Sequence, residues 1–224
     1  MLMSSPNENR AGYSGLFISI DGIDGCGKTS QVKALKRFFE MRGSEVFLTK
    51  EPGGTFAGKN LRNMLLSDDY DIEPETELLL YCADRVEHQK KIVIPYTDRG
   101  VNVISDRFVM STYAYQIFGR KLNKKILDFV TAETVTRFPD LNIIIDTDVD
   151  TAVKRARKRL EHENMVQEEG KFEKLSQHFF NDVRQGFLWC AENFPNTFVV
   201  NGDCKFEEVH NKIKELVLNL VKKV

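Results

Sequence analysis

The sequence predicts an α/β protein, a doubly wound five-stranded parallel sheet flanked by helices. Five short apolar runs recur along the 224 residues, and longer segments with helical periodicity separate them. The runs are nearly continuous rather than alternating, which is typical of strands buried on both faces. Alternation of such strands with helices indicates a parallel sheet that is covered on both sides. In sheets of this class, ligands bind beyond the carboxyl ends of the strands.

The elements are predicted in chain order from these patterns. A helix is expected over residues 30–41, a second starts near Ile126 and stops before Pro139, and a third covers residues 206–220. The five strands are expected at residues 16–21, 45–49, 101–105, 141–146 and 197–200.

The first predicted strand leads into Gly-Ile-Asp-Gly-Cys-Gly-Lys-Thr, which fits the phosphate-binding pattern G-x-x-x-x-G-K-[ST] in full. In such a loop, glycines let successive backbone N–H groups converge on an anion, and the next helix adds its positive dipole end. Lys28 is expected to reach the β- and γ-phosphates of ATP, and the Thr29 hydroxyl to ligate Mg²⁺. The pattern predicts a P-loop NTPase architecture with the ATP-binding residues Gly22, Ile23, Asp24, Gly25, Cys26, Gly27, Lys28 and Thr29.

Composition narrows the class of protein further. A formal net charge of −1 provides no basic field, so a nucleic-acid polymer is not an expected partner. No apolar run approaches the roughly 18 residues of a membrane span, so no membrane partner is expected. The four cysteines form no C-x-x-C pair, and one lies inside the phosphate-binding loop, which favours a reducing, cytoplasmic setting.

The chain shows no repeat, low-complexity region or linker that would divide it. Residues 15–224 are therefore expected to form a single domain built around the P-loop. Residues 1–14 are polar and lack the apolar core of a signal peptide, so a disordered N-terminal tail is expected there.

Polar residues also follow two other predicted strands. Asp106 and Arg107 offer a carboxylate for a metal and a planar guanidinium for phosphate oxygens, although a surface ion pair would fit the same pattern. Glu51 opens the segment Glu-Pro-Gly-Gly-Thr, which on its own indicates a turn. Beside a phosphate-binding loop, Glu51 becomes a candidate site carboxylate and Arg62 a candidate phosphate contact.

Two helical segments carry further candidates. Tyr81 and Arg85 share one face of a predicted helix, where ring and guanidinium can stack on and hydrogen-bond to a nucleobase. A core tyrosine beside a solvated arginine is the alternative. Residues 154–159 are basic at five of six positions, which is typical of a solvated helix face. The alternative there is a basic lid, near residues 155–173, that closes over the transferring phosphoryl group.

Together these segments resemble the thymidylate kinase family, whose members phosphorylate dTMP. The shared markers occur in family order: the phosphate-binding loop, Glu-Pro-Gly-Gly-Thr, Tyr-Cys-Ala-Asp-Arg and Asp-Arg-Phe-Val-Met-Ser-Thr-Tyr-Ala-Tyr-Gln, then an Arg-rich segment. The resemblance spans nearly the whole chain from residue 16. It implies transfer of the γ-phosphoryl group of ATP to dTMP with Mg²⁺, in dTTP synthesis, by a homodimer.

The resemblance also implies roles for single residues. Asp24 would contact the 3′-hydroxyl of the acceptor, Arg107 would hold the acceptor and donor phosphates near each other, and Asp106 would lie close to the magnesium. Tyr81 takes a position where relatives usually have a phenylalanine stacked on thymine, and Arg85 would bond the carbonyl edge of the base. The remaining implied dTMP contacts are Glu51, Arg62, Thr112 at the base and Tyr115 at the deoxyribose.

The chain departs from the family in two places. Some relatives have an arginine directly after the loop carboxylate, where this chain has Gly25; it thereby resembles the bacterial type, in which the lid supplies the catalytic arginine. The lid lacks the usual Gly, Asp-Arg and Glu pattern, and Lys171 stands where an arginine is expected. Arg159 is therefore the first candidate for the catalytic arginine, ahead of Arg157 and Arg155.

Two alternatives share the phosphate-binding loop. Another P-loop nucleotide or nucleoside kinase would have the same loop and sheet and would differ in its acceptor. A GTP-binding switch protein would need the guanine-reading motif Asn-Lys-x-Asp, and residues 123–126 have isoleucine in place of the aspartate. The missing motif argues against the switch protein.

Overall fold

The computed structural model describes residues 14–163 and 176–222, and of residues 159–163 it describes the backbone alone. The predicted tail therefore lies outside the described residues except for Ser14, as does the lid segment beyond residue 163. The elements in chain order are β1 (Phe17–Asp21), α1 (Lys28–Glu40), β2 (Val46–Lys50), α2 (Phe56–Leu66), α3 (Pro74–His88), α4 (Ile94–Asp98), β3 (Asn102–Asp106), α5 (Val109–Thr112), α6 (Lys124–Thr134), β4 (Leu141–Asp146), α7 (Val149–Glu163), α9 (Gln177–Asn193), β5 (Thr197–Asn201) and α10 (Phe206–Val221).

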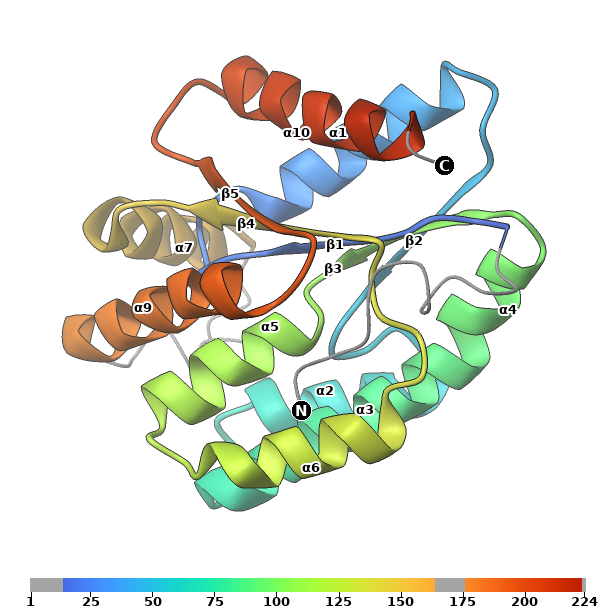
Figure 1. Cartoon of the computed structure of the whole chain (residues 1–224). Coiled ribbons are helices and arrows are strands. Elements are labelled where there is room, and N and C mark those ends of the chain that lie inside the picture. Colours follow the sequence, from blue (N-terminus) through green and yellow to red (C-terminus); the bar gives the residue numbers. More distant parts are fainter. Residues whose placement is uncertain (1–13, 164–175, 223–224) are drawn as a thin grey trace.

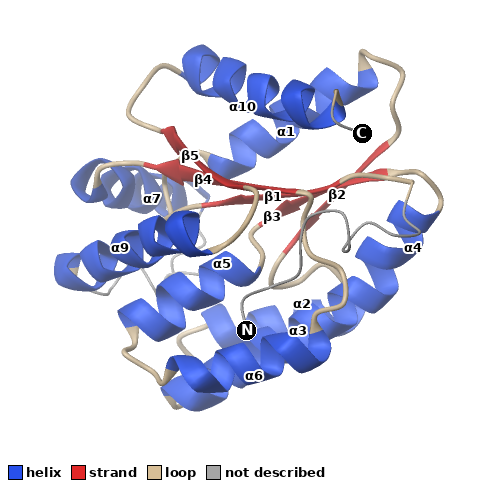
Figure 2. Cartoon of the chain, in the orientation of Figure 1, coloured by secondary structure: helices blue, strands red, loops and turns tan. Residues whose placement is uncertain are grey.

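The strands form one five-stranded sheet in the order β2-β3-β1-β4-β5, and all neighbouring pairs are parallel. Helices α1 and α10 cover one face, while α3, α5, α6 and α9 lie on the other (Figure 1). The red strands of Figure 2 form a single twisted layer between these two layers of helices. The predicted doubly wound α/β fold is confirmed, and each strand begins and ends within one residue of its predicted bounds.

The sheet is the centre of the hydrophobic core, which explains the continuous apolar runs. Every residue of β1 is buried, and so are the first five residues of β4. Phe17 of β1 packs edge-to-face on Phe108, with ring centroids 5.1 Å apart. Truncation of such a buried phenylalanine to alanine costs about 3 to 5 kcal/mol. The core therefore holds the carboxyl ends of the strands, and the loops that follow them, in fixed positions.

Local sequence explains how the helices around the sheet begin. The hydroxyl of Thr55, the last residue of Glu-Pro-Gly-Gly-Thr, accepts a hydrogen bond from the Gly58 backbone N–H at 2.9 Å and caps α2. Ser176 caps α9 in the same way through the Phe179 N–H. Two helices continue into π-helical segments, Gln89–Val93 after α3 and Tyr113–Gly119 after α5, which the periodicity did not predict.

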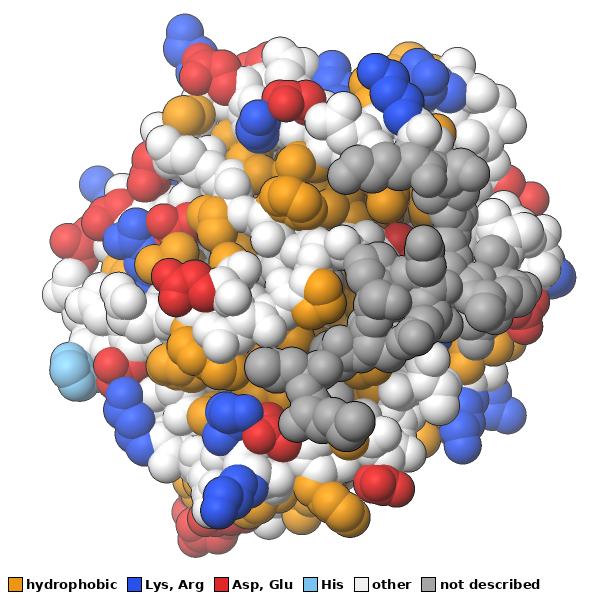
Figure 3. Space-filling model, in the orientation of Figure 1, with side chains coloured by type: hydrophobic (Ala, Val, Ile, Leu, Met, Phe, Trp, Pro, Cys, Tyr) orange, Lys and Arg blue, Asp and Glu red, His pale blue; other side chains and the backbone are white. Residues whose placement is uncertain are grey.

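The surface matches the composition. On the face shown in Figure 3, lysines and arginines are scattered among aspartates and glutamates rather than gathered in a basic patch. In the described part of the chain, no helix is both long and apolar enough to cross a membrane.

Candidate active site

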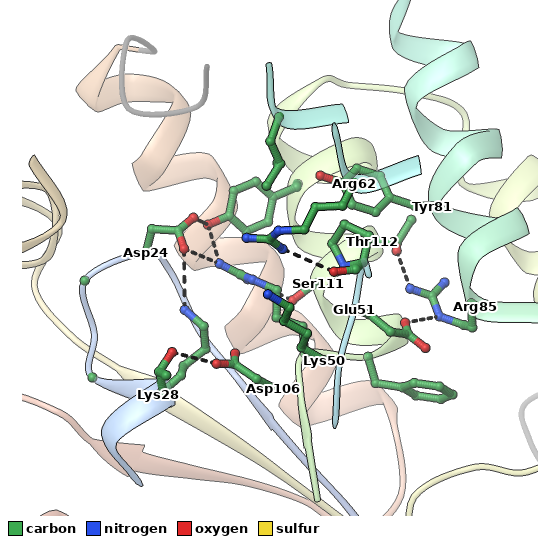
Figure 4. Close-up of a pocket in the computed structure, with 18 of the residues that line it drawn as sticks. Asp24, Lys28, Lys50, Glu51, Arg62, Tyr81, Arg85, Asp106, Ser111 and Thr112 are labelled. Atoms are coloured by element: carbon green, nitrogen blue, oxygen red, sulfur yellow. Dashed lines mark hydrogen bonds and ion pairs between the residues drawn. The ribbon is translucent and has the colours of Figure 1, made fainter. Parts of the chain in front are cut away.

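A cavity of about 580 Å³ opens beyond the carboxyl ends of β1, β2 and β3, where the fold predicts a ligand site. The phosphate-binding loop, the loop after β2, and helices α2, α3 and α5 contribute its walls. Figure 4 shows Asp24, Lys28 and Asp106 together at one end and Glu51 and Arg85 at the other. Most of the predicted site residues line it: Asp24, Gly25, Gly27, Lys28, Thr29, Glu51, Arg62, Tyr81, Arg85, Asp106, Arg107, Thr112 and Tyr115.

The phosphate-binding loop presents Lys28 and Thr29 at the first end of the cavity. Gly27 has a φ of 97°, a left-handed conformation that favours glycine, and α1 starts directly after it at Lys28. The Lys28 ammonium donates to the Ile23 carbonyl at 2.9 Å and lies 3.7 Å from the Asp24 carboxylate. The side chains of Ile23 and Cys26 are buried and do not line the cavity, so a phosphate can meet only the backbone of these two residues.

Thr29 and Asp106 bring two oxygens together at the same end. The Thr29 hydroxyl donates to an Asp106 carboxylate oxygen at 2.7 Å. A hydroxyl and a carboxylate are hard oxygen ligands, the kind that Mg²⁺ takes alongside the phosphates of its nucleotide. This pair fits a magnesium ion. Asp106 does not form an ion pair with Arg107, because the guanidinium of Arg107 pairs with Asp24 instead.

Arg107 turns away from Asp106 because its backbone leaves the strand in a left-handed conformation, with a φ of 76°. Such a conformation is rare outside glycine and marks a constrained position. One end of its guanidinium pairs with Asp24 at 2.6 Å, while the other donates to the Gly22 carbonyl at 3.0 Å and the Ser111 hydroxyl at 2.9 Å. The guanidinium is thereby aimed across the phosphate end of the cavity.

The Asp24 carboxylate contacts Lys28, Arg107 and Tyr115 at the phosphate end of the cavity. Its second oxygen accepts a hydrogen bond from the Tyr115 hydroxyl at 2.8 Å, and the Arg107 guanidinium lies over the Tyr115 ring. Burial opposes a charge on Asp24, but Arg107 and Lys28 outweigh it and hold the pKa of Asp24 below its ordinary value. Burial and the Asp24 charge raise the pKa of Tyr115 well above its ordinary value. The carboxylate is therefore charged and the phenol neutral at physiological pH.

Arg85 dominates the opposite end. Its side chain is only 3% exposed; its Nε donates to Glu51 at 2.9 Å, its Nη2 donates to the Thr112 hydroxyl at 2.7 Å, and the guanidinium lies over the Phe108 ring. The alternative of a solvated arginine is wrong. Both carboxylate oxygens of Glu51 are engaged, since the second pairs with His88.

Tyr81 and Arg62 also line the cavity. Tyr81 is half-buried, and its hydroxyl has no hydrogen-bond partner among the described side chains, whereas its ring faces the cavity (Figure 4). Burial, with the charge of Glu77, raises the pKa of Tyr81 above its ordinary value, so the phenol is neutral. The Arg62 guanidinium donates to the Pro52 carbonyl at 3.2 Å.

The basic helix α7 approaches the cavity from the phosphate side. Arg155 lines the cavity, whereas Lys154 and Arg157 line a separate hollow between α7 and α9. The side chain of Arg159, the first candidate for the catalytic arginine, and the whole of Lys171 lie outside the described residues. Arg159 follows Arg155 by four residues, so helical spacing places both on one face of α7.

Gly25 marks where α7 meets the phosphate-binding loop. A Cβ at this position would lie 1.9 Å from the Ala152 carbonyl oxygen, and the φ of Gly25 is +84°. Backbone packs on backbone here, so no side chain fits. The absence of an arginine after the loop carboxylate thus has a steric reason.

Several residues that the sequence did not single out also belong to the site. Ser111 links Arg107 to the buried Asp21, and Gln116 and Lys50 line the cavity. Helical spacing does not identify Ser111, because Arg107 precedes α5 and has a left-handed backbone conformation. His88 follows Arg85 by three residues on the same helix, but this spacing does not show that the histidine is buried or that it contacts Glu51.

Comparison with known proteins agrees with this geometry. The family model of thymidylate kinase matches residues 20–213. The chain is 44% identical to a thymidylate kinase of Maridesulfovibrio salexigens over 92% of this chain and 97% of that protein, and 38% identical to one of Kosmotoga olearia over 92% and 98%. It is also similar to the crystal structure of thymidylate kinase from Ehrlichia chaffeensis, with a TM-score of 0.73 and 29% identity over 91% of this chain and 99% of that one. The chain belongs to the thymidylate kinase family.

Proposed function

We propose that this protein transfers the γ-phosphoryl group of ATP to dTMP, giving dTDP and ADP, as a step in dTTP synthesis. The observation that carries the proposal is a single cavity with a phosphate-binding loop at one end and a buried, oriented arginine beside an aromatic ring at the other. The first end suits the triphosphate, and the second suits a nucleobase. Arg107 lies between them.

The phosphate end would hold the donor. Backbone N–H groups of residues 22–29 and the start of α1 bind the phosphate chain, and the Lys28 ammonium exchanges its contact with the Ile23 carbonyl for phosphate oxygens. Thr29 and Asp106 would hold Mg²⁺, which when bound neutralises charge on the phosphates. These groups lower the barrier by position and charge rather than by covalent chemistry.

The opposite end would hold the acceptor. The Tyr81 ring stacks on thymine, Arg85 donates to the carbonyl edge of the base, and Thr112 lies beside that guanidinium. Tyr115 packs against the deoxyribose and Asp24 accepts from its 3′-hydroxyl. Arg62 approaches the acceptor phosphate, and Glu51 acts through Arg85, because both of its oxygens are already engaged.

Transfer would then proceed between two phosphates. An oxygen of the dTMP phosphate attacks the γ-phosphorus of ATP, and the bond to the β-γ bridging oxygen breaks to release ADP. The attacking oxygen is already anionic, so no general base is required. Lys28, Arg107 and an arginine of α7 meet the charge that develops on the transferring group. Among the arginines of α7 whose side chains are described, Arg155 is the one that lines the cavity.

We also propose that the protein is a homodimer in the cytoplasm. Helices α3 and α6 pack together on the outer layer and leave Leu79 53%, Ile126 41% and Phe129 68% exposed, an apolar surface suited to a second copy. The cysteines are free thiols, which suits a reducing compartment. Light scattering should give twice the mass of one chain, and Phe129→Lys should shift it toward the monomer.

The acceptor is tested with a panel of nucleoside monophosphates. ATP, Mg²⁺ and purified protein are combined with dTMP, dUMP, dCMP, dAMP or dGMP, and both ADP and the nucleoside diphosphate are quantified. Saturable formation of dTDP, with the other acceptors much slower, supports the proposal. ADP release that is independent of dTMP, or faster with another acceptor, contradicts it and favours another P-loop nucleotide kinase.

A further inference from the structure

Behind the base end of the cavity lies a polar group that bound substrate cannot touch. His88 occupies the last turn of α3, three residues after Arg85, and is 0% exposed. It is not among the residues that line the cavity. Any contribution of this imidazole to substrate binding must therefore pass through its neighbours.

The two ring nitrogens of His88 join the two segments on either side of it. Nδ1 lies 2.7 Å from an oxygen of Glu51, and Nε2 lies 2.7 Å from the hydroxyl of Thr49 in β2. Because a carboxylate only accepts hydrogen bonds, Nδ1 carries the proton and donates. In the neutral imidazole Nε2 then accepts from the Thr49 hydroxyl. The imidazole thus ties Glu51 to the end of β2.

The loop after β2 is packed tightly around this imidazole. A Cβ on Gly54 would lie 2.7 Å from the Cδ2 atom of His88 and 2.7 Å from the Thr49 hydroxyl. The imidazole fills the space beneath Glu-Pro-Gly-Gly-Thr, and the second glycine of that segment leaves room for it. The ring therefore has little freedom to rotate away from Glu51.

Glu51 passes this constraint on to Arg85. One Glu51 oxygen accepts from His88, and the other accepts from Arg85 Nε at 2.9 Å. Thr112 holds Nη2 of the same guanidinium. Within the described part of the chain Nη1 makes no hydrogen bond, and Arg85 lines the cavity. Nη1 is thus the nitrogen left to donate to a ligand, and its direction depends on how firmly Glu51 is held.

We propose that His88 is a positioning residue for acceptor recognition. Through Glu51 it fixes the rotamer of Arg85, so that Nη1 meets the carbonyl edge of the base without rearrangement. The inference deepens the proposed function and rests on it. A preorganised donor loses less conformational freedom when its ligand binds, so the effect should appear in the affinity for the acceptor. It should not appear in the affinity for ATP, whose binding loop lies at the far end of the cavity.

The two amide substitutions at His88 separate its two contacts. His88→Asn places a donor near Nδ1 and keeps the contact with Glu51. In His88→Gln, the amide reaches toward Thr49 and the contact with Glu51 is lost. We expect His88→Gln to raise the Kd and KM of dTMP about 10-fold, the equivalent of one hydrogen bond to a charged group, and His88→Asn to raise them about 3-fold or less. The Kd of ATP should stay within about 2-fold in both variants, because neither contact lies at the phosphate end.

A double-mutant cycle and two controls sharpen the test. If His88 acts through Glu51, the Kd of dTMP for the double variant Glu51→Gln/His88→Gln should equal that of the weaker-binding single variant rather than the product of both effects. His210→Gln, at a histidine that contacts Gln31 on the opposite side of the sheet, should leave the Kd of dTMP unchanged. If His88→Gln does not fold, Thr49→Val replaces it, with an expected rise of about 2- to 3-fold.

Equal losses of dTMP and ATP affinity in His88→Gln, or a lowered Tm with an unchanged Kd of dTMP, would overturn the inference and leave a structural histidine. These outcomes are separable from failure of the proposed function. In that case the unsubstituted protein would itself not form dTDP or bind dTMP. Isothermal titration with each nucleotide alone, beside steady-state kinetics, provides both readouts.

Discussion

The two ends of the cavity hold their charges in different ways. At the phosphate end, Asp24 and Arg107 are 24% and 15% exposed and form ion pairs that phosphate oxygens can replace. At the base end, Glu51 and Arg85 are each 3% exposed, and a buried histidine and a threonine hold them from behind. Binding at the phosphate end therefore exchanges contacts, whereas binding at the base end adds a contact to a fixed frame. The difference suggests that rate depends on the first end and selectivity on the second.

The dependence of rate on the phosphate end would be contradicted most clearly if Lys28 could be replaced without loss of rate. We expect Lys28→Ala to lower kcat by about 10³-fold, because the ammonium meets charge that develops on the transferring phosphoryl group. The KM of dTMP should change little. A coupled assay of ADP release measures both. Lys36→Ala, on an exposed turn of the same helix, is the matched control and should retain full activity; a Lys28→Ala rate within 3-fold of normal would remove Lys28 from the mechanism.

A second effect at the phosphate end is expected from α7. Arg155 lines the cavity and Arg157 does not, although both are exposed on the same helix. Arg155→Ala should lower kcat about 10²-fold, less than the loss of a sole catalytic arginine because Arg107 shares its task. Arg157→Ala should stay near the normal rate. Equal rates for the two variants would mean that another residue supplies the arginine, with Arg159 the first to replace.

Burial of a carboxyl group at the base end should make the free energy of unfolding depend on pH. Asp84, beside Arg85, accepts from the Gly53 N–H, while its second oxygen has no partner in the part of the chain that is described. Burial, and to a smaller extent repulsion from Glu51, raises the pKa of Asp84 from 3.8 to about 6, although the Gly53 N–H and the charge of Arg85 act in the opposite direction. The folded state thus binds this proton more tightly than the unfolded state. The stability contributed by protonated Asp84 is therefore lost as pH rises from about 4 to about 6.

Asp84→Asn removes that dependence. At pH 7.5 we expect the variant to be more stable than the original protein by about 2 kcal/mol, a value below the full linkage because the buried amide NH2 would replace an oxygen that has no hydrogen-bond partner among the described residues. The gain should shrink progressively as pH falls below 6. Urea unfolding at pH 5.0 and 7.5 measures it. The same difference in free energy at both pH values would show that Asp84 does not titrate in this range.

The smallest effect is expected from the Tyr81 hydroxyl. It has no hydrogen-bond partner among the described residues, and the ring supplies the stacking surface. Tyr81→Phe should change the KM of dTMP by less than about 3-fold, whereas Tyr81→Leu, which removes the aromatic face, should raise it about 10-fold. A large effect of Tyr81→Phe would instead assign the hydroxyl a direct contact with the acceptor.

The sheet and most residues that line the cavity were predictable because both depend on local sequence patterns. Continuous apolar runs locate buried strands, and parallel strands bring Lys28, Glu51 and Asp106 to one edge of the sheet. The residues that hold the cavity-lining side chains from behind, such as His88, were not predictable. A buried histidine carries no sequence mark that distinguishes it from an exposed one, and its role emerges only when β2, the following loop and α3 are placed together.

The arginines of α7 illustrate the same limit at the phosphate end. Their order along the chain favours Arg159, whose side chain lies outside the described residues. Of the two arginines of α7 whose side chains are described, Arg155 lines the cavity and Arg157 does not, and the rotation of the helix sets this difference. The π-helical segments are a related case, because each depends on a locally shifted hydrogen-bond pattern that periodicity does not register.

The close contact between Gly25 and Ala152 has a consequence for how such enzymes can diverge. Because the two backbones touch, a larger residue in the loop requires that the start of α7 withdraw at the same time. A single substitution at position 25 therefore cannot place an arginine there while α7 keeps its position. An arginine in the loop would require compensating changes around residue 152, so the two segments are expected to change together.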